Sequence, residues 1–218
     1  MSMNPEPHPR KAGRRPYDAR ARRARARAAR TATLDEAERL FLDRGYDGTT
    51  VEAIARAAGV SAATIYKSHG GKAGLVRELC RRALAGERAT PAEDRSDALV
   101  RDSADPADVV RGWGALAAEV SPRVSPLALL LQRAAGGEQE AARLLAELED
   151  ARLRRMTDNA RRLVSRGHVR RGVTVEEARD VMWMCTSPEL YDLMVVRRGW
   201  STDRFGTLIA DTLAGALL

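Results

Sequence analysis

The chain has 218 residues, an apolar fraction of 44% and a net charge of +7, so it can bury a core of its own and is not disordered throughout. The charge is uneven, because residues 1–30 hold ten basic and two acidic residues and the remainder is nearly neutral. Cys80 and Cys185 are the only cysteines, which argues against a disulfide scaffold or a cysteine-rich zinc site. No apolar run reaches the ~20 residues of a membrane span, and the basic N-terminus lacks a signal peptide's apolar segment. We therefore expect a cytoplasmic protein with no membrane partner.

Beyond residue 30, apolar residues recur at spacings of three and four, and no stretch alternates cleanly between apolar and polar residues. This pattern predicts an all-α fold of about nine helices or slightly more. The first helix ends at Gly45, but its start is ambiguous. Thr33 to Glu36 reads as a capping box, whereas the Ala/Arg run before it could extend the helix backwards. We place the start near Arg30.

Capping residues and glycine or proline stops predict the remaining helices. Their expected ranges are 51–58, 62–69, 72–87, 106–121, 127–135, 138–166, 175–185, 189–198 and 202–217. Residues 88–105 are polar, contain a proline and show no lasting period, so we expect a linker there. The chain then divides into a flexible basic arm (residues 1–30), a small helical domain (31–89) and a larger one (90–218).

Residues 50–70 have the spacing of a helix-turn-helix, in which the second of two short helices is presented to the major groove of DNA. Ala55 is small where the two helices would cross, and Gly59 supplies the backbone freedom for the turn. Ile54 and Ile65 would fill the space beneath. An ordinary helical hairpin with a glycine turn is the alternative interpretation of these residues.

A longer pattern makes the helix-turn-helix interpretation specific. Its elements are Ala37, Leu40-Phe41, Gly45-Tyr46, Thr50-Val51, Ile54-Ala55, Ala58-Gly59-Val60-Ser61, Thr64-Ile65-Tyr66, Lys72 and Leu75. With these elements, residues 34–79 resemble the DNA-binding domain of the tetracycline-repressor (TetR) family of bacterial transcriptional regulators. The resemblance implies that residues 31–89 bind DNA and that residues 90–218 form a helical effector-binding and dimerisation domain. His69 departs from the family pattern, which usually has Phe there, so His69 either packs under the helix or faces phosphate.

The resemblance also implies roles for individual residues. Thr50 and Tyr66 would donate hydroxyls to phosphates, and Lys72 would meet the DNA backbone. The residues expected to face the bases are Ser61, Ala62, Ala63, Thr64 and Lys67. In the basic arm, we expect minor-groove or phosphate contacts from Arg22, Arg23 and Arg27. The alternative is a merely solvated charge run, because Arg outnumbers Lys throughout the chain.

Two further sets of residues belong to the larger domain. The resemblance implies an effector cavity among its helices, and an apolar lining there suits a lipophilic molecule. The expected lining residues are Trp113, Leu116, Leu127, Leu130, Leu131, Met156, Leu163 and Trp183. Each could instead be an ordinary core residue.

The last helix carries an apolar stripe wider than a terminal helix needs, so with the helix at 175–185 it is expected to form a dimer interface. The expected interface residues are Val181, Phe205, Leu208, Ile209, Thr212, Leu213 and Ala216. Packing of this stripe onto its own subunit is the alternative.

The sequence therefore predicts a DNA-binding transcriptional regulator, most simply a ligand-responsive repressor that binds a pseudo-palindromic operator as a dimer. Its expected partners are double-stranded DNA, a second copy of the chain and a small lipophilic effector, with no cofactor. An effector-independent architectural protein that binds DNA through the arm is the alternative. An enzyme is disfavoured, because there is no phosphate loop or nucleophile motif, and His8, His69 and His168 are too dispersed for a metal cluster.

Overall fold

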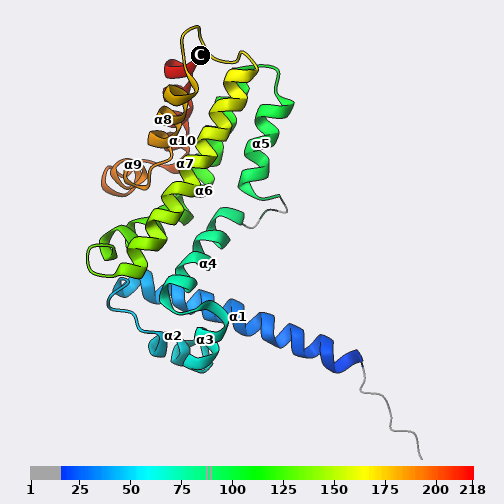
Figure 1. Cartoon of the computed structure of the whole chain (residues 1–218), viewed down its shortest axis with the longest axis vertical. Coiled ribbons are helices and arrows are strands. Elements are labelled where there is room, and N and C mark those ends of the chain that lie inside the picture. Colours follow the sequence, from blue (N-terminus) through cyan, green and yellow to red (C-terminus); the bar gives the residue numbers. More distant parts are fainter. Residues whose placement is uncertain (1–15, 87, 89) are drawn as a thin grey trace, which may run out of the picture.

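The computed structural model describes residues 16–86, 88 and 90–218, and within them every regular element is helical. This confirms the all-α prediction. The elements are α1 (Pro16–Arg44), α2 (Val51–Ala58), α3 (Ala62–His69), α4 (Lys72–Ala85), α5 (Ala92–Asp102), α6 (Pro106–Ala134), α7 (Gln139–Ser165), α8 (Val175–Cys185), α9 (Pro188–Tyr191), the π-helix η1 (Asp192–Arg197) and α10 (Thr202–Leu217). The helices α1–α3 lie at one end of the molecule, α5–α10 form a bundle at the other, and α4 runs between them (Figure 1).

Buried apolar side chains form two clusters. The first lies beneath α1–α4, which we call the head, and it continues into the C-terminal half of α6 and the start of α7 through residues such as Leu131 and Leu144. The second cluster lies between α5, the N-terminal half of α6, the end of α7, α8 and α10. We call this group of helices the body. Because the first cluster is shared, the long helices α6 and α7 hold the head against the body.

Most predicted helix ends are confirmed by capping geometry. Ser61 accepts a hydrogen bond from the Thr64 backbone N–H at 3.1 Å, and Gly59, with φ of 66°, ends α2 in the left-handed conformation. Thr174 and Glu177 form the reciprocal hydrogen bonds of a capping box at the start of α8. These local signals lie in the sequence itself, and they position α3 in particular.

The predicted start of the first helix is wrong. α1 begins at Pro16, so residues 16–30, which were expected to belong to a flexible arm, continue the helix of the head. Thr33 is not a cap but an interior residue, and its hydroxyl donates to the Ala29 carbonyl at 2.8 Å. Alanine and arginine both have high helix propensity, which explains the extension.

Two other helix predictions are also wrong. The expected linker contains α5, whose buried residues Ala92, Ser96 and Val100 are spaced four apart and cover one face. The chain also passes through Pro122 and Pro126 as one helix, α6, rather than as two. Proline removes one backbone hydrogen bond and disfavours a helix interior, but packing of α6 against α4, α7 and α10 outweighs this local preference.

The expected helix at 189–198 consists of α9 followed by the π-helix η1 rather than of one α-helix. Gly199, with φ of 69°, ends this segment before α10. Among the helices that the structure describes, none is both long and apolar enough to cross a membrane.

Candidate DNA-binding surface and ligand cavity

The helix-turn-helix has the predicted geometry. Ile54 of α2 and Ile65 of α3 are completely buried against the head, and the Val60 N–H donates to the Ala55 carbonyl at 3.0 Å across the turn. With its inner face fixed in this way, α3 presents its other faces to solvent. A helix held by its neighbours and exposed along its outer side is suited to entering a major groove.

The exposed surface of α3 contains most of the residues predicted to face the bases. Ala63, Thr64 and Lys67 are exposed, and Ala62 is half-buried. Ser61 is exposed, but its hydroxyl is already engaged in hydrogen bonds. Its oxygen caps α3 and lies 2.8 Å from the Thr64 hydroxyl oxygen. Lys67 is therefore the longest free side chain on this surface, and it carries a charge that can reach guanine acceptors.

Thr50 and Tyr66, the predicted phosphate ligands, are both exposed, with 54% of Tyr66 accessible. The Thr50 oxygen accepts from the Ala53 N–H at 3.1 Å, which leaves its proton free to donate. The neighbouring Thr49 was not singled out from the sequence. It is buried, and its hydroxyl lies 2.8 Å from the Gly45 carbonyl and 3.0 Å from that of Leu40, so it fixes the turn before α2.

Lys72 lies differently from the sequence-based expectation. Its ammonium donates to the Tyr46 carbonyl at 3.2 Å, lies 4.3 Å from the centre of the Tyr46 ring and is 3.6 Å from a Glu138 oxygen. Burial, with the carboxylates of Glu140 and Glu138 nearby, raises the pKa of Tyr46 to about 12. In this conformation Lys72 joins the head to the start of α7 and does not project from the surface.

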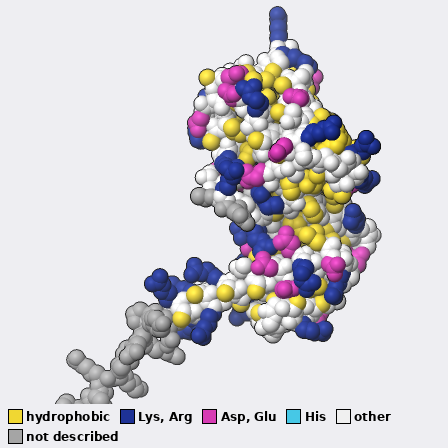
Figure 2. Space-filling model, turned by 180° about the vertical axis from the view of Figure 1, so that it is seen from behind, with side chains coloured by type: hydrophobic (Ala, Val, Ile, Leu, Met, Phe, Trp, Pro, Cys, Tyr) yellow, Lys and Arg dark blue, Asp and Glu magenta, His cyan; other side chains and the backbone are white. Residues whose placement is uncertain are grey.

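The N-terminal part of α1 projects away from the molecule and carries a dense positive charge. Arg22, Arg23 and Arg27 are all exposed along it, and Figure 2 shows basic side chains on several sides of this projecting segment. Arg30, nearer the head, is tied to Glu78 at 3.3 Å. The predictions that fall on residues 1–15 lie outside the described residues.

The body contains a cavity of about 270 Å³ between α4, α5, α6, α7, α8, α9 and α10, lined mainly by apolar side chains. Trp113, Leu116 and Met156, three of the predicted lining residues, do line it. The other five predicted lining residues lie elsewhere. Leu127, Leu130 and Leu131 are in the first core cluster and Leu163 is in the second, while Trp183 is 37% exposed and stacks on Arg152. The sequence shows that these residues are apolar but not which space they face.

One end of the cavity is polar. Ser96 of α5 and Asn159 of α7 line the cavity beside Trp113, and both were missed in the sequence. The Trp113 indole N–H donates to the Ser96 hydroxyl oxygen at 3.0 Å, and the Asn159 amide donates to the same oxygen at 3.2 Å. In the sequence Ser96 is one of many polar residues between 88 and 105, and its burial is evident only in the fold.

The helix α4 contributes Cys80 and Leu84 to the cavity wall. Cys185 of α8 lies in the same wall. Burial raises the pKa of the Cys80 thiol to about 12 and that of Cys185 to about 11, so both remain protonated and act as small apolar groups. A molecule in the cavity would thus touch the same helix that carries the head.

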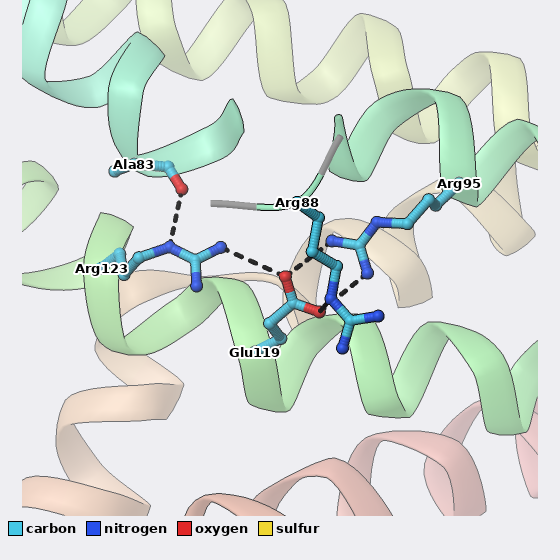
Figure 3. A network of polar contacts seen from close by, with 5 residues as sticks. All are labelled: Ala83, Arg88, Arg95, Glu119 and Arg123. Carbon is cyan, nitrogen blue, oxygen red and sulfur yellow. Dashed lines mark hydrogen bonds and ion pairs between the residues drawn. The ribbon is translucent and has the colours of Figure 1, made fainter. Parts of the chain in front are cut away.

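A polar network joins the end of α4 to α5 and α6 (Figure 3). Glu119 accepts two hydrogen bonds from Arg95, at 2.7 and 2.8 Å, and lies 3.3 Å from Arg88 and 3.5 Å from Arg123. Arg123 in turn donates to the carbonyl of Ala83, in the last turn of α4, at 2.9 Å. The hydrogen bonds from Arg95 are the main reason why the pKa of Glu119 is lowered. The sequence did not indicate this network, because Arg95 fell in the expected linker.

The residues predicted for a dimer interface divide into two groups. Phe205, Ile209 and Leu213 are at most 2% exposed, because α10 packs against α6 and α8 of its own subunit. Val181, Leu208, Thr212 and Ala216 are half-buried and retain accessible surface. Met184 of α8, 50% exposed, was not in the predicted set.

These features define a helix-turn-helix DNA-binding protein with a separate cavity in its body. Residues 34–79 match the sequence model of the family described as bacterial regulatory proteins, tetR family. Residues 34–79 therefore form a DNA-binding domain of the type found in tetR-family regulatory proteins. A comparison with curated proteins finds no match.

Several solved structures share the fold. NalD, the secondary repressor of the MexAB-OprM multidrug efflux pump of Pseudomonas aeruginosa, is 22% identical, covers 89% of this chain and 98% of its own, and has a TM-score of 0.68. SmeT in complex with triclosan is 21% identical over 88% of this chain and 92% of its own, with a TM-score of 0.69. The fatty acid degradation regulator FadR of Bacillus halodurans is 16% identical over 86% and 95%, with a TM-score of 0.67. The fold thus extends over nearly the whole chain.

Proposed function

We propose that this protein is a ligand-responsive repressor that binds a pseudo-palindromic operator as a homodimer. The observation that carries the proposal is the position of Cys80 and Leu84, which belong to the helix of the head and also line the cavity of the body. A ligand in the cavity would therefore contact α4, which directly follows α3 in the head. That SmeT was solved with triclosan supports a small molecule as the effector.

In this proposal α3 enters the major groove. Lys67 contributes the main base contact, and Ala62, Ala63 and Thr64 contribute methyl and hydroxyl contacts. Thr50 and Tyr66 donate to phosphates on either side. The exposed arginines of α1, Arg22, Arg23 and Arg27 among them, add sequence-independent affinity by neutralising phosphates.

Two copies would meet through α8 and α10. We assign the contact to the accessible members of the predicted set, Val181, Leu208, Thr212 and Ala216, together with Met184. Leu208→Arg should then split the dimer, which sedimentation at micromolar concentration measures. Leu153→Arg is the matched control, because Leu153 is an exposed leucine of α7 outside the predicted set. Domain limits of 31–89 and 90–218, and a cytoplasmic location, remain predictions.

Regulation would act through α4. A ligand that displaces Leu84 moves the end of α4, where Arg123 holds the Ala83 carbonyl. The two heads would then adopt a spacing that no longer fits successive major grooves. Because a ligand shifts such an equilibrium only by its differential affinity for the two states, a coupling of about 1–3 kcal/mol would weaken operator binding ~5–150-fold.

The test is an effector screen. Lipophilic compounds are added to the full chain, binding is followed by tryptophan fluorescence, and operator affinity is measured with and without each binder. We expect at least one binder to weaken operator binding, and operator DNA to weaken that binder by the same factor. Leu84→Ala should reduce the coupling while leaving operator affinity without ligand intact. Tight cavity binders with no effect on operator affinity would contradict the proposal.

The second candidate is an architectural protein that binds DNA without an effector. The observation that favours it is the projecting, basic first half of α1. Such a protein would bind cognate and random duplexes with similar affinity and a steep salt dependence. Binding curves on both duplexes at several salt concentrations separate the two functions.

A further inference from the structure

The polar end of the cavity has two hydrogen-bonding groups without a partner among the described residues. Asn159 is 4% exposed, and while its amide nitrogen donates to Ser96, its Oδ1 atom accepts nothing. The Ser96 oxygen already accepts from Trp113 and from Asn159. With both of its lone pairs used, the Ser96 hydroxyl has only its proton left to offer.

An acceptor and a donor therefore lie next to each other at the edge of an apolar space. Polar groups buried in this way are normally paired, and each one that lacks a partner in a native structure calls for a physical reason. A ligand that supplies the missing partners satisfies this requirement.

The remainder of the cavity leads away from this polar end along α7. Leu145, Leu148, Met156 and Asn159 all line it. At a rise of ~1.5 Å per residue, the distance from Leu145 to Asn159 along the helix is about 21 Å. The lining along this stretch is mainly apolar, but it also includes Glu149, Arg152 and Arg155. Arg152 donates to the Trp183 carbonyl and Arg155 pairs with Asp97.

We propose that the cavity binds an uncharged, elongated and largely apolar alcohol, whose hydroxyl donates to Asn159 Oδ1 and accepts from the Ser96 hydroxyl. One hydroxyl carries both the donor and the acceptor that the site lacks. A carboxylate would face the lone pairs of Asn159 Oδ1, and an alkylammonium would leave the Ser96 proton without an acceptor. This inference rests on the proposed effector role of the cavity and names the chemistry of its ligand.

The test compares three probes of equal chain length: 1-nonanol, its methyl ether and nonanoate. Dissociation constants are measured on the full chain by calorimetry or by tryptophan fluorescence. The ether can still accept from Ser96 but cannot donate to Asn159. We expect 1-nonanol to bind about tenfold more tightly than either other probe, a typical effect of one buried hydrogen bond with its desolvation.

The decisive variant is Asn159→Leu, which keeps the volume of the side chain and removes the acceptor. We expect the Asn159→Leu variant to bind 1-nonanol and the ether with about equal dissociation constants. Met156→Leu, one turn away in the same wall, is the control and should change both affinities alike while preserving their ratio. If Asn159→Leu does not fold, the ratio of the dissociation constants of the ether and 1-nonanol on the wild-type chain still tests the inference.

Equal affinities of the wild type for the alcohol and the ether would overturn the inference. So would a preference that survives in Asn159→Leu, or no binding of 1-nonanol. Operator affinity is measured separately with 1-nonanol bound. An alcohol that binds with the expected preference but leaves operator affinity unchanged would contradict the proposed regulation. The same result would still support the hydroxyl-binding site.

Discussion

Gly114 of α6 and Gly206 of α10 face each other where the two helices cross. A Cβ atom on Gly114 would lie 2.4 Å from the Gly206 carbonyl oxygen, and one on Gly206 would lie 2.8 Å from the Gly114 carbonyl oxygen. Both distances are well below van der Waals contact. The backbones of α6 and α10 therefore touch, and this contact fixes α10 beside Trp113, which lines the cavity.

We expect Gly114→Ala to lower the free energy of unfolding by about 1–3 kcal/mol, because the methyl group meets backbone that cannot move away without separating the helices. Urea unfolding followed by circular dichroism measures the change. Gly136→Ala is the control, since Gly136 has no neighbour within 4 Å of the added atom, and its effect should stay within about 0.5 kcal/mol. Similar values for the two variants would contradict the close crossing.

The exposed arginines of α1 should contribute a salt-dependent part of DNA affinity. We expect the triple substitution of Arg22, Arg23 and Arg27 by Gln to weaken binding to all duplexes. The slope of log K against log salt should flatten by about 0.9 for each phosphate that the variant no longer neutralises. Glutamine preserves helix propensity, so α1 should remain helical. Replacing the exposed Arg154, Arg161 and Arg171 of the body is the control. Weaker binding with an unchanged slope would mean that these arginines do not meet phosphate.

His69 should make the head sensitive to acid. Burial, with a contribution from the charge of Arg30, lowers the pKa of His69 from its ordinary value of 6.5. As pH falls below that value, the unfolded chain binds a proton that the folded chain does not, so the free energy of unfolding decreases until the lowered pKa is reached. His69→Phe and His69→Gln should both lack this component between pH 7.5 and pH 5.5. Denaturant unfolding at several pH values measures it, and a wild-type profile parallel to those of the variants would contradict the assignment.

Both cysteines should react slowly in the folded protein. The raised pKa values of Cys80 and Cys185, about 12 and about 11, leave almost no thiolate at pH 8. We expect a thiol-specific reagent such as DTNB to modify them on the order of 100-fold more slowly than in guanidinium. Because both line the cavity, a bound lipophile should slow the reaction further. Rapid modification without denaturant would show that the cavity opens freely to solvent.

The head could be predicted from the sequence almost residue by residue, because its signals are local. Thr50 and Ser61 cap their helices, and Gly59 takes the positive φ that the turn needs. Such determinants act within a few residues and can be recognised in the sequence. Lys72 is the exception, since its partner Glu138 is distant in sequence and reaches it only in the fold.

The body could be predicted only in outline. Local signals would end α6 at Pro122, yet packing against other helices, α4, α7 and α10 among them, carries it through to Ala134. The same limit applies to the cavity, because an apolar stripe does not show whether a residue such as Leu131 meets another side chain or an empty space. The most informative pair, Ser96 and Asn159, is polar, and its members are brought together from two helices by packing alone.

Quantitative footprinting of the full chain, with wild type and Lys67→Ala, on DNA flanking its own gene and on random duplex tests most directly whether α3 reads DNA sequence. We predict a protected pseudo-palindromic site that the wild type binds at least about 10³-fold more tightly than random DNA, with base preference altered at one or two positions by Lys67→Ala. Equal affinity for both duplexes, unchanged in preference by Lys67→Ala, would contradict the account.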